Sequence, residues 1–202
     1  MRVNERTFTS AARRAQIVAA AIDVIAELGL AAATFARIAE RAELSSTRMI
    51  SYHFAGRDDL MEAVVARVFE VGGEYVGPFV LEEPTPAGQL RGFIVGNARF
   101  YAEFREHVLA VREVWSNLRR PDGTRRFGFE LHEPEFEMMA GIFRAGQASG
   151  EFRTFDPRIM AITLRQALDG LSLRVHTDPE ADVDAWTREL VATFDAATRR
   201  LP

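Results

Sequence analysis

Apolar residues recur at intervals of three and four positions along almost the whole chain, and no stretch alternates strictly between apolar and polar residues. The first spacing places apolar side chains on one face of an α-helix, whereas strict alternation is typical of a β-strand. The pattern therefore predicts an all-α fold of about nine helices with no sheet. The expected helices cover residues 10–28, 34–41, 45–53 and 107–119, a segment from 57 onward, and segments beginning near 86, 134, 157 and 183.

Short polar residues precede four of these helices and predict where the helices begin. The side-chain oxygen of such a residue accepts a hydrogen bond from a backbone N–H group of the first helical turn. Thr85 and Asp156 are also followed by proline, which is favoured at the first helical position. The predicted N-caps are Thr34, Thr85, Asp156 and Asp182.

Glycine and proline indicate where the helical pattern stops. Gly29 is expected to end the first helix in the left-handed conformation, and Thr9 or Ser10 should cap its start. Residues 72–86 concentrate Gly and Pro, so we expect the boundary between an N-terminal head of three helices and a C-terminal helical bundle there, with the fourth helix joining the two. A polar connection over residues 119–132 carries the turn signal Pro-Asp-Gly.

Charge is unevenly distributed along the chain. The net charge is −4 at pH 7, but residues 1–57 hold eight Arg against five acidic residues, whereas the rest holds 17 basic residues against 24 acidic ones. Clustered positive charge is needed to neutralise DNA phosphates. The head is therefore the part of the chain that could bind nucleic acid, and the overall acidity belongs to the body.

Composition excludes several functional classes. The absence of cysteine excludes disulfides and thiolate metal sites, and no apolar run approaches the roughly 18–20 residues that cross a bilayer. We expect a soluble, cytoplasmic protein without a cofactor or a membrane partner. No arrangement of serine, histidine or paired carboxylates indicates an enzyme.

One acidic cluster could in principle bind a cation. Metal sites need fixed geometry, and this cluster spans the end of the polar connection and the start of the next helix. We interpret it as a solvated loop and helix start, and predict no metal site. The cluster consists of Glu130, His132, Glu133 and Glu135.

Residues 34–57 carry the clearest functional pattern: a short capped helix, a tight turn and a second short helix. A helix this short is not stable alone and must be held by apolar neighbours, which leaves its polar side free. A rigid helix with hydroxyl and Arg side chains near its start suits the DNA major groove. The candidate DNA-binding residues are Thr34, Arg37, Ser45, Ser46, Thr47, Arg48, Ser51, Tyr52, His53 and Arg57.

The stretch IAERAELSSTRMISYHFAGRDDL, residues 38–60, resembles the helix-turn-helix signature of the tetracycline-repressor (TetR) family of transcriptional regulators. The match covers the second helix of that signature, the serine that caps its third helix, and the exit into the fourth helix. The matching positions are Ile38, Ala39, Ala42, Ser46, His53, Phe54 and Leu60.

Three positions depart from the family pattern. Glu43 stands where the family usually has Gly, and the turn is one residue longer, so the Ser45–Ser46 pair supplies two candidate caps. The family's phosphate-contacting Tyr aligns with Ser51, and Tyr52 follows it, which leaves both as candidates for that contact. Arg57 replaces the usual Lys at the start of the fourth helix and keeps the positive charge.

The resemblance implies a helix-turn-helix DNA-binding domain over residues 1–57 and a ligand-binding and dimerisation domain over residues 58–202. It implies a homodimer through the last two helices, acting on palindromic operator DNA, and most often a repressor that its ligand releases. Two paired heads double both the contacts and the specificity of one short helix. An activator remains an alternative.

The ligand is implied by the resemblance alone, as a small apolar or amphipathic effector. Aromatic and Met side chains of the body form its core by default, but a pocket would use the same lining together with a few polar groups. The candidate ligand-binding residues are Phe93, Asn97, Phe100, Arg112, Trp115, Met139, Phe143, Gln166 and Asp169.

Alternatives remain open at the level of function and of the N-terminus. A helical adaptor that binds protein, or a small-molecule enzyme that uses a cavity of the body, is also compatible with the sequence. Salt-dependent binding to DNA would distinguish a DNA-binding regulator from an adaptor, because phosphate contacts are strongly salt-dependent. At the N-terminus, either an arm enters the minor groove or the terminal charge is disordered, and the residues concerned are Arg2, Arg6, Arg13 and Arg14.

Overall fold

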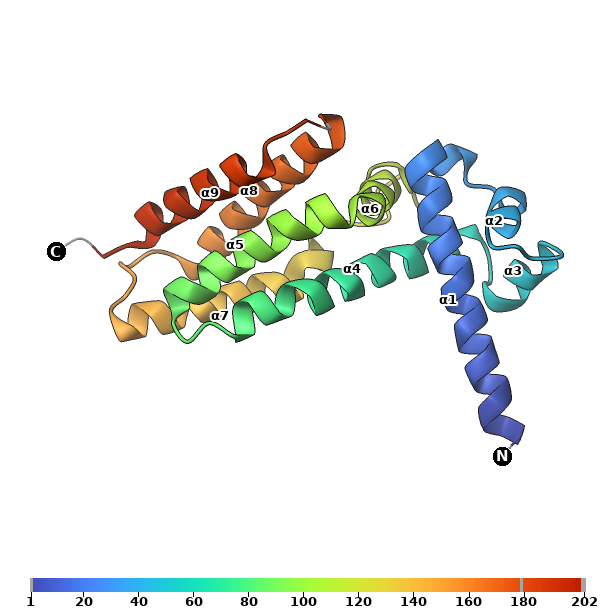
Figure 1. Cartoon of the computed structure of the whole chain (residues 1–202), viewed down its shortest axis with the longest axis horizontal. Helices are drawn as coiled ribbons and strands as arrows, with labels where there is room; N and C mark the ends of the chain where they lie inside the picture. The colour runs from blue at the N-terminus through green and yellow to red at the C-terminus, as the bar shows by residue number, and fades with distance from the viewer. Residues whose placement is uncertain (1, 179, 201–202) are drawn as a thin grey trace. The chain divides into compact units, whose positions relative to one another are not determined.

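The computed structural model describes residues 2–178 and 180–200, with side chains from residue 10 onward. Within these residues the fold is helical, as the hydrophobic pattern predicts, with nine α-helices, two short 3₁₀ helices and no strand beyond isolated bridges (Figure 1). None of the helices in the described part of the chain is long and apolar enough to span a bilayer. The α-helices are α1 Arg2–Leu28, α2 Phe35–Arg41, α3 Arg48–His53, α4 Arg57–Leu81, α5 Pro86–Glu103, α6 Arg105–Asn117, α7 Glu133–Ser149, α8 Pro157–Thr177 and α9 Val183–Thr198.

The chain folds into two compact units that interleave along the sequence. The first comprises residues 1–70 and 106–128, and the second comprises residues 71–105 and 129–202. Helix α4 therefore contributes to both units, and α6 belongs to the first. The predicted DNA-binding domain (residues 1–57) and ligand-binding domain (residues 58–202) are defined by function, whereas these units are defined by packing. The functional division therefore stays a prediction.

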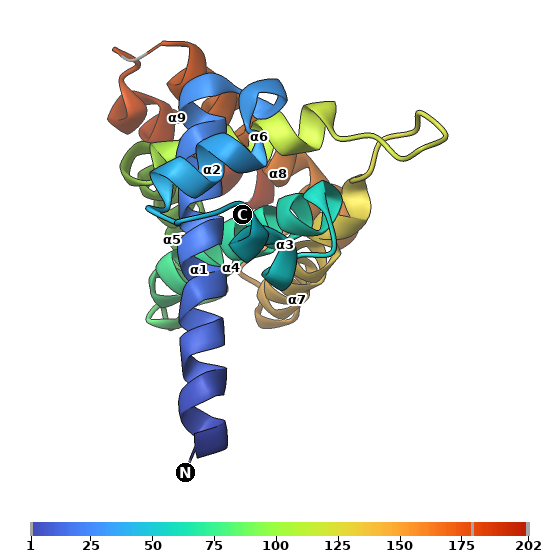
Figure 2. The ribbon, with the colours of Figure 1, turned by 90° about the vertical axis from the view of Figure 1, so that its right-hand side faces the viewer.

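In the first unit, α1 packs against both α2 and α3 (Figure 2). The apolar face predicted for α1 makes this contact, and Ile17 and Ile25 are fully buried. Ile38 of α2 and Ile50 of α3 are also fully buried. The three helices therefore share one apolar core, which fixes the two short helices that could not be stable alone.

The two ends of α1 differ from the expectation. The helix begins at Arg2, so neither Thr9 nor Ser10 caps it, since no Gly or Pro interrupts residues 2–9. Gly29 takes a positive φ of 79°, but its ψ of 162° lies outside the left-handed helical region. This combination is open chiefly to glycine, and it leads the chain directly into a short 3₁₀ helix.

The four predicted N-caps form. In each, the side-chain oxygen accepts a hydrogen bond from a backbone N–H group two or three residues later. Gly150 ends α7 in the left-handed conformation, with φ of 80° and ψ of 8°. The capping residues are Thr34, Thr85, Asp156 and Asp182.

The Gly- and Pro-rich residues 72–86 do not end the fourth helix where the sequence predicts a boundary. Helix α4 continues through most of them to Leu81 and contains Pro78. This part of α4 packs within the second unit, where α5 approaches it so closely that a Cβ atom on Gly92 would lie 1.9 Å from the carbonyl oxygen of Phe79. Only the last few residues of the stretch form a loop.

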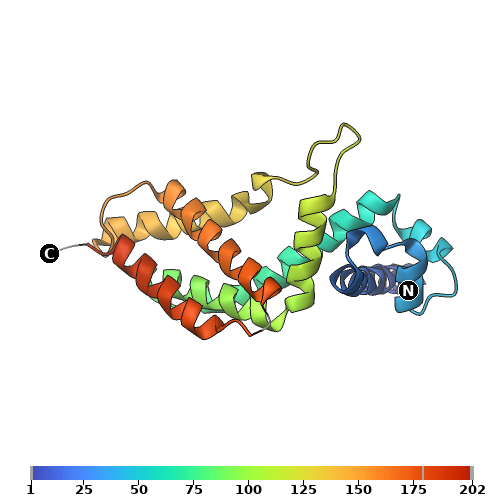
Figure 3. The ribbon, with the colours of Figure 1, turned by 90° about the horizontal axis from the view of Figure 1, so that it is seen from above.

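In the second unit, α5 packs against α7, α8 and α9, and α7 also packs against α8 (Figure 3). Ile94 of α5, Phe143 of α7 and Leu168 of α8 are fully buried and lie in the core of this bundle. At its surface, Arg91 of α5 forms an ion pair with Asp195 of α9 at 2.7 Å. The helical bundle predicted for the body is thus present.

The polar connection after α6 begins with a tight turn of the first unit. The turn predicted at residues 121–123 forms, with Gly123 at a positive φ of 82°. Arg126, just beyond it, forms an ion pair with Glu62 on α4. The connection is therefore tied to the first unit at this point.

Candidate functional site

Helix α3 presents a polar surface to solvent. Thr47 and Arg48 stand at its start and Ser51 and Tyr52 one turn later, and all four side chains are exposed. The Tyr52 ring is 80% exposed and lies edge-on to His53, with ring centroids 5.0 Å apart. Hydroxyl groups, a guanidinium and an aromatic ring on one surface suit contacts to phosphates and base edges.

The opposite side of α3 is buried. Ile50 is fully buried, and Phe54, which directly follows the helix, is 2% exposed. A helix of six residues has too few internal hydrogen bonds to hold its own geometry. The core of the first unit therefore sets the direction in which the polar side of α3 points.

The expectation that Ser45 or Ser46 occupies the cap position of α3 is wrong: the helix begins at Arg48, its cap residue is Thr47, and the Thr47 side chain makes no capping hydrogen bond. Ser46 Oγ accepts a hydrogen bond from the Arg48 N–H group at 3.2 Å, so of the Ser45–Ser46 pair it is Ser46 that supplies the oxygen. Glu43 takes a positive φ of 51°, in the left-handed region. That conformation costs a residue with a Cβ atom about 1–2 kcal/mol. The turn thus has a backbone shape that glycine adopts more easily.

Three predicted DNA-binding residues bond to their own unit. Thr34 caps α2, and Arg37 Nη1 donates to the Ala32 carbonyl oxygen at 3.1 Å. Arg57 donates through Nη2 to the Leu30 carbonyl oxygen. All three side chains belong to exposed residues, and a DNA contact by any of them stays a prediction.

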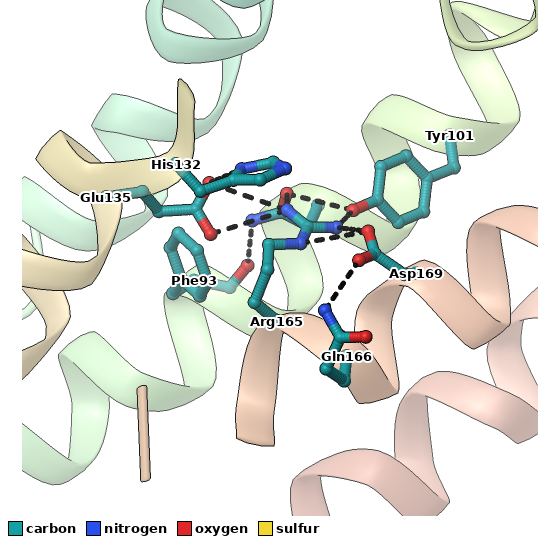
Figure 4. A network of polar contacts seen from close by, with 8 residues as sticks. Phe93, Tyr101, His132, Glu135, Arg165, Gln166 and Asp169 are labelled. Atoms are coloured by element: carbon teal, nitrogen blue, oxygen red, sulfur yellow. Dashed lines mark hydrogen bonds and ion pairs between the residues drawn. The ribbon is translucent and has the colours of Figure 1, made fainter. Parts of the chain in front are cut away.

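A second polar cluster lies inside the second unit, around Arg165 on α8 (Figure 4). Arg165 is only 6% exposed. Its guanidinium donates to the Tyr101 hydroxyl and, through Nε at 3.1 Å, to Asp169. At 3.4 Å and 3.5 Å, Nη1 also reaches Glu135 and Asn97. Because these partners come from α5, α7 and α8, one arginine joins three helices.

The charges in this cluster determine each other's protonation. Burial alone lowers the pKa of Arg165, but the Tyr101 phenol and the two neighbouring carboxylates outweigh it and raise that pKa. Burial raises the pKa of Tyr101 to about 12, against the opposing charge of Arg165. Burial also raises the pKa of Glu135, but Arg165 and His132 reverse this and hold that pKa below its ordinary value. The cluster is therefore ionic at neutral pH, with a protonated Tyr.

The expectation of a solvated loop and helix start is wrong for His132 and Glu135. Their side chains are 14% and 21% exposed, and His132 Nδ1 lies 3.8 Å from the Glu135 carboxylate. The reason is tertiary, because the first turn of α7 places Glu135 beside the buried cation of Arg165. Glu133 pairs instead with Arg158 at 2.6 Å, and both are half-exposed. In the part of the chain that the structure describes, no group of three or more His and acidic residues could hold a metal ion.

The central residue of this cluster, Arg165, is not among the predicted site residues, although the sequence contains a signal for it. Arg165 follows Ala161 by four positions and precedes Leu168 by three, so it lies within the apolar stripe of α8. A charged residue in such a stripe must be paired, because an isolated buried charge is costly. Tyr101 and Glu135 carried no comparable signal.

The nine ligand candidates are divided between the two units. Arg112 and Trp115 belong to α6 in the first unit, and the other seven belong to the second. Asn97 and Asp169 join the Arg165 cluster, and Gln166 donates to Asp169 at 3.2 Å. The remaining four are buried in the core: Phe93, Phe100, Met139 and Phe143.

Known proteins match this chain over the helix-turn-helix and beyond it. Residues 17–64 match the sequence model of the family described as "Bacterial regulatory proteins, tetR family". The HTH-type transcriptional regulator BetI of Ectopseudomonas mendocina (strain ymp) is 33% identical over 171 residues, which are 84% of each chain. BetI 1 of Chromohalobacter salexigens is 35% identical over 112 residues, and that alignment spans about half of the relative, 55% of its length.

Solved structures show the same fold. A TetR-like transcriptional regulator from Rhodococcus sp. RHA1 superimposes with a TM-score of 0.67 at 21% identity, covering 89% of this chain and 92% of that one. The ketosteroid transcriptional regulator KstR2 of Mycobacterium tuberculosis gives a TM-score of 0.68 at 18% identity, covering 94% of this chain and 96% of that one.

The fold and the exposed helix α3 define a helix-turn-helix protein. With a relative that matches over most of both chains, the chain belongs to the TetR family of bacterial transcriptional regulators. The matched relatives are named as transcriptional regulators. Glu43 occupies the turn position at which this family usually has glycine, and its positive φ supplies the physical reason for that preference.

Proposed function

We propose that the protein is a cytoplasmic homodimeric repressor that binds a palindromic operator through α3 and is released by a small apolar or amphipathic effector. The observation that carries the DNA-binding part is the two-sided character of α3. Its buried side belongs to the core, and its exposed side offers Thr47, Arg48, Ser51 and Tyr52 together. Such a helix can enter a major groove without losing its own packing.

Within this proposal, Arg48 reads a base or clamps a phosphate, and Tyr52 contacts the backbone. Arg48 stands at the start of α3, where recognition helices make their base contacts. The large exposed ring of Tyr52 favours it over the shorter Ser51 for a phosphate contact, because its hydroxyl reaches further from the helix.

The dimer part of the proposal is supported by exposed apolar residues on the last two helices. Ile159 and Leu173 of α8 are 65% and 46% exposed, and Trp186 of α9 is 42% exposed. Large apolar side chains that a single chain leaves in water are stabilised when a second copy covers them. Two copies would also present two α3 helices to the two halves of a palindrome.

The effector part of the proposal rests on family membership and on the chemistry of the second unit. Buried aromatic and Met side chains surround a small number of polar groups there, which is the composition of small-molecule sites. The polar groups of the Arg165 cluster would orient the polar end of an amphipathic effector. A helical adaptor or an enzyme is not favoured by any specific observation on these residues.

The test of DNA binding starts from a pool of random-sequence duplexes, from which the purified protein selects its sites. We expect a palindromic consensus, and binding to a fluorescent duplex of that sequence that weakens as salt concentration rises. Arg48→Ala should weaken this binding by about 5- to 150-fold, equivalent to the roughly 1–3 kcal/mol of one base contact. Arg67→Ala is the matched control, because Arg67 is an exposed arginine of α4 that pairs with Glu70 at 2.6 Å. Failure to enrich any sequence, or equal losses in both variants, would contradict the proposal.

A further inference from the structure

The C-terminal end of α3 is held from outside the helix by an arginine of α1. The last carbonyl groups of a helix have no partner within it and carry partial negative charge. At the end of α3, Arg14 Nη1 donates a hydrogen bond to the His53 carbonyl oxygen at 2.6 Å. The contact joins residues 39 positions apart in the sequence. A cation at this end of a helix is electrostatically favourable.

The same arginine also fixes the residues that follow α3. Its guanidinium carbon lies 4.1 Å from the centre of the Phe54 ring, within the range of a cation–π interaction. Arg14 Nη2 lies 3.7 Å from Asp59 Oδ1, and Asp59 Oδ2 accepts a hydrogen bond from the Ala55 N–H group at 2.8 Å. Arg14 therefore contacts the end of α3, its apolar anchor and the first turn of α4.

The start of the turn that leads into α3 is also held by a side chain of α1. Gln16 Nε2 donates a hydrogen bond at 2.7 Å to the carbonyl oxygen of Ala42, the C-cap residue of α2. Gln16 Oε1 in turn accepts from Arg13 Nη1 at 2.7 Å, which orients the amide. Two side chains of α1 thus hold both ends of residues 42–53, the segment that contains the turn and α3.

We infer that Arg14 and Gln16 are positioning residues for DNA recognition, which set the orientation of α3 without touching DNA. The inference rests on the proposed role of α3 as the recognition helix. It differs from the idea of an N-terminal arm in the minor groove, because the polar groups of Arg14 are directed at His53 and Asp59. An arm residue would need its guanidinium free for the phosphates or the groove floor.

A short helix that is held in place by contacts from outside should bind DNA more weakly when those contacts are lost. If only a fraction of the molecules hold α3 in the binding orientation, the apparent dissociation constant rises by the inverse of that fraction. Removing Arg14 takes away three contacts at one end while leaving the buried anchors Ile50 and Phe54 in place. The head should therefore stay folded while its DNA affinity falls.

The test measures operator affinity at several salt concentrations for Arg14→Met, Gln16→Leu and the double variant, using the duplex selected by the unmodified protein. We expect each single variant to lose roughly three- to tenfold in affinity and the double variant at least tenfold. The dependence of log K on log salt concentration should keep its slope, because no phosphate contact is removed. Arg14→Lys should recover part of the loss, since it returns a cation to the His53 carbonyl.

The control variant is Arg41→Met. Arg41 is also an arginine of the first unit, 40% exposed against 43% for Arg14, but it pairs with Glu27 and Asp23 of α1 and not with α3. It should bind DNA like the unmodified chain. The fraction of protein able to bind DNA is measured by stoichiometric titration for each variant. A variant whose head is only less stable then shows a lower active fraction but an unchanged dissociation constant.

Three results overturn the inference. A salt slope lower by about one in Arg14→Met would make Arg14 a direct phosphate contact. An affinity equal to that of the unmodified chain, or a loss explained entirely by the active fraction, would give Arg14 no role in positioning. These results differ from a failure of the proposed function, in which the unmodified protein selects no DNA or Arg48→Ala has no effect.

Discussion

The substitution Arg165→Met would remove the main charge that opposes the burial of the Glu135 carboxylate, leaving His132 as its remaining partner. Methionine keeps much of the volume of the side chain but none of its hydrogen-bond donors. Tyr101 and Asn97 would lose a donor at the same time, and Asp169 can turn toward solvent because its side chain is 42% exposed. Breaking one partner of a buried ion pair costs about 3–5 kcal/mol. We expect a loss of this size in the free energy of unfolding.

The measurement is urea unfolding followed by circular dichroism, at one fixed protein concentration because a dimer is stabilised by mass action. The matched control is Arg158→Met on the same helix. Arg158 forms its ion pair with Glu133 at 2.6 Å, but both side chains are about half exposed. Exposed pairs contribute about 0–1 kcal/mol, so the control should lose little.

The loss should also depend on pH in a defined direction. In the unmodified chain Glu135 has a lowered pKa, so its stabilising contribution is present above its unfolded pKa and is lost as pH falls through the folded value. In Arg165→Met the burial of Glu135 is opposed by His132 alone, so the pKa of Glu135 should rise relative to the unmodified chain. Acid then neutralises the buried charge, and the difference in stability between the two proteins should narrow as pH falls from 7 toward about 4.

A second substitution separates the buried charge from simple loss of packing. Adding Glu135→Gln to Arg165→Met removes the carboxylate that has lost its main partner and should restore part of the lost stability, since a neutral amide costs less to bury. Equal losses for Arg165→Met and Arg158→Met would refute the reasoning. So would a double variant no more stable than the single one, or a difference that is the same at every pH.

Three further predictions concern the turn, the helix packing and the dimer. Glu43→Gly should raise the free energy of unfolding by up to about 1 kcal/mol, because relief of the positive φ exceeds the entropic cost of glycine; a loss of stability in urea unfolding would contradict this. Gly92→Ala should lower the free energy of unfolding by about 1–3 kcal/mol through the clash with the Phe79 carbonyl. Gly73→Ala, with open space around its Cβ position, should be neutral or stabilising. Similar melting temperatures for the two variants would argue against the close α4–α5 contact. Trp186→Asp should shift sedimentation velocity from dimer toward monomer, and an unchanged dimer would remove α9 from the interface.

Local signals in the sequence were sufficient for most helix boundaries and for the recognition motif. The caps at Thr34, Thr85, Asp156 and Asp182 form because capping depends on one side chain and the backbone within three residues of it. The short helix α2 could be located for the same reason, whereas α3 begins at Arg48, later than the serine pair predicts. The apolar positions of both helices, such as Ile38 and Ile50, are buried as the pattern requires.

The start of α1 could not be predicted, because helix-compatible polar residues carry no stop signal and nothing local distinguishes residues 2–9 from the helix that follows. The sequence also did not show that Thr47 occupies the cap position of α3, or that Ser46 and not Ser45 accepts a hydrogen bond there. Two adjacent serines offer the same chemistry, and only the path of the turn places one oxygen against the Arg48 N–H group.

What the sequence determined by itself is the helical class, the helix-turn-helix and the polar side of α3, since these follow from periodicity, caps and residue types that act over a few positions. The tertiary structure decided what depends on residues far apart in the chain. Helix α4 continues through a stretch rich in Gly and Pro, where it packs closely against Gly92 of α5. Glu135 is largely shielded from solvent because it pairs with the buried guanidinium of Arg165. Arg14 bonds to the end of α3, 39 positions away in the sequence. Each outcome depends on which distant group becomes the partner, and no short-range pattern contains that information.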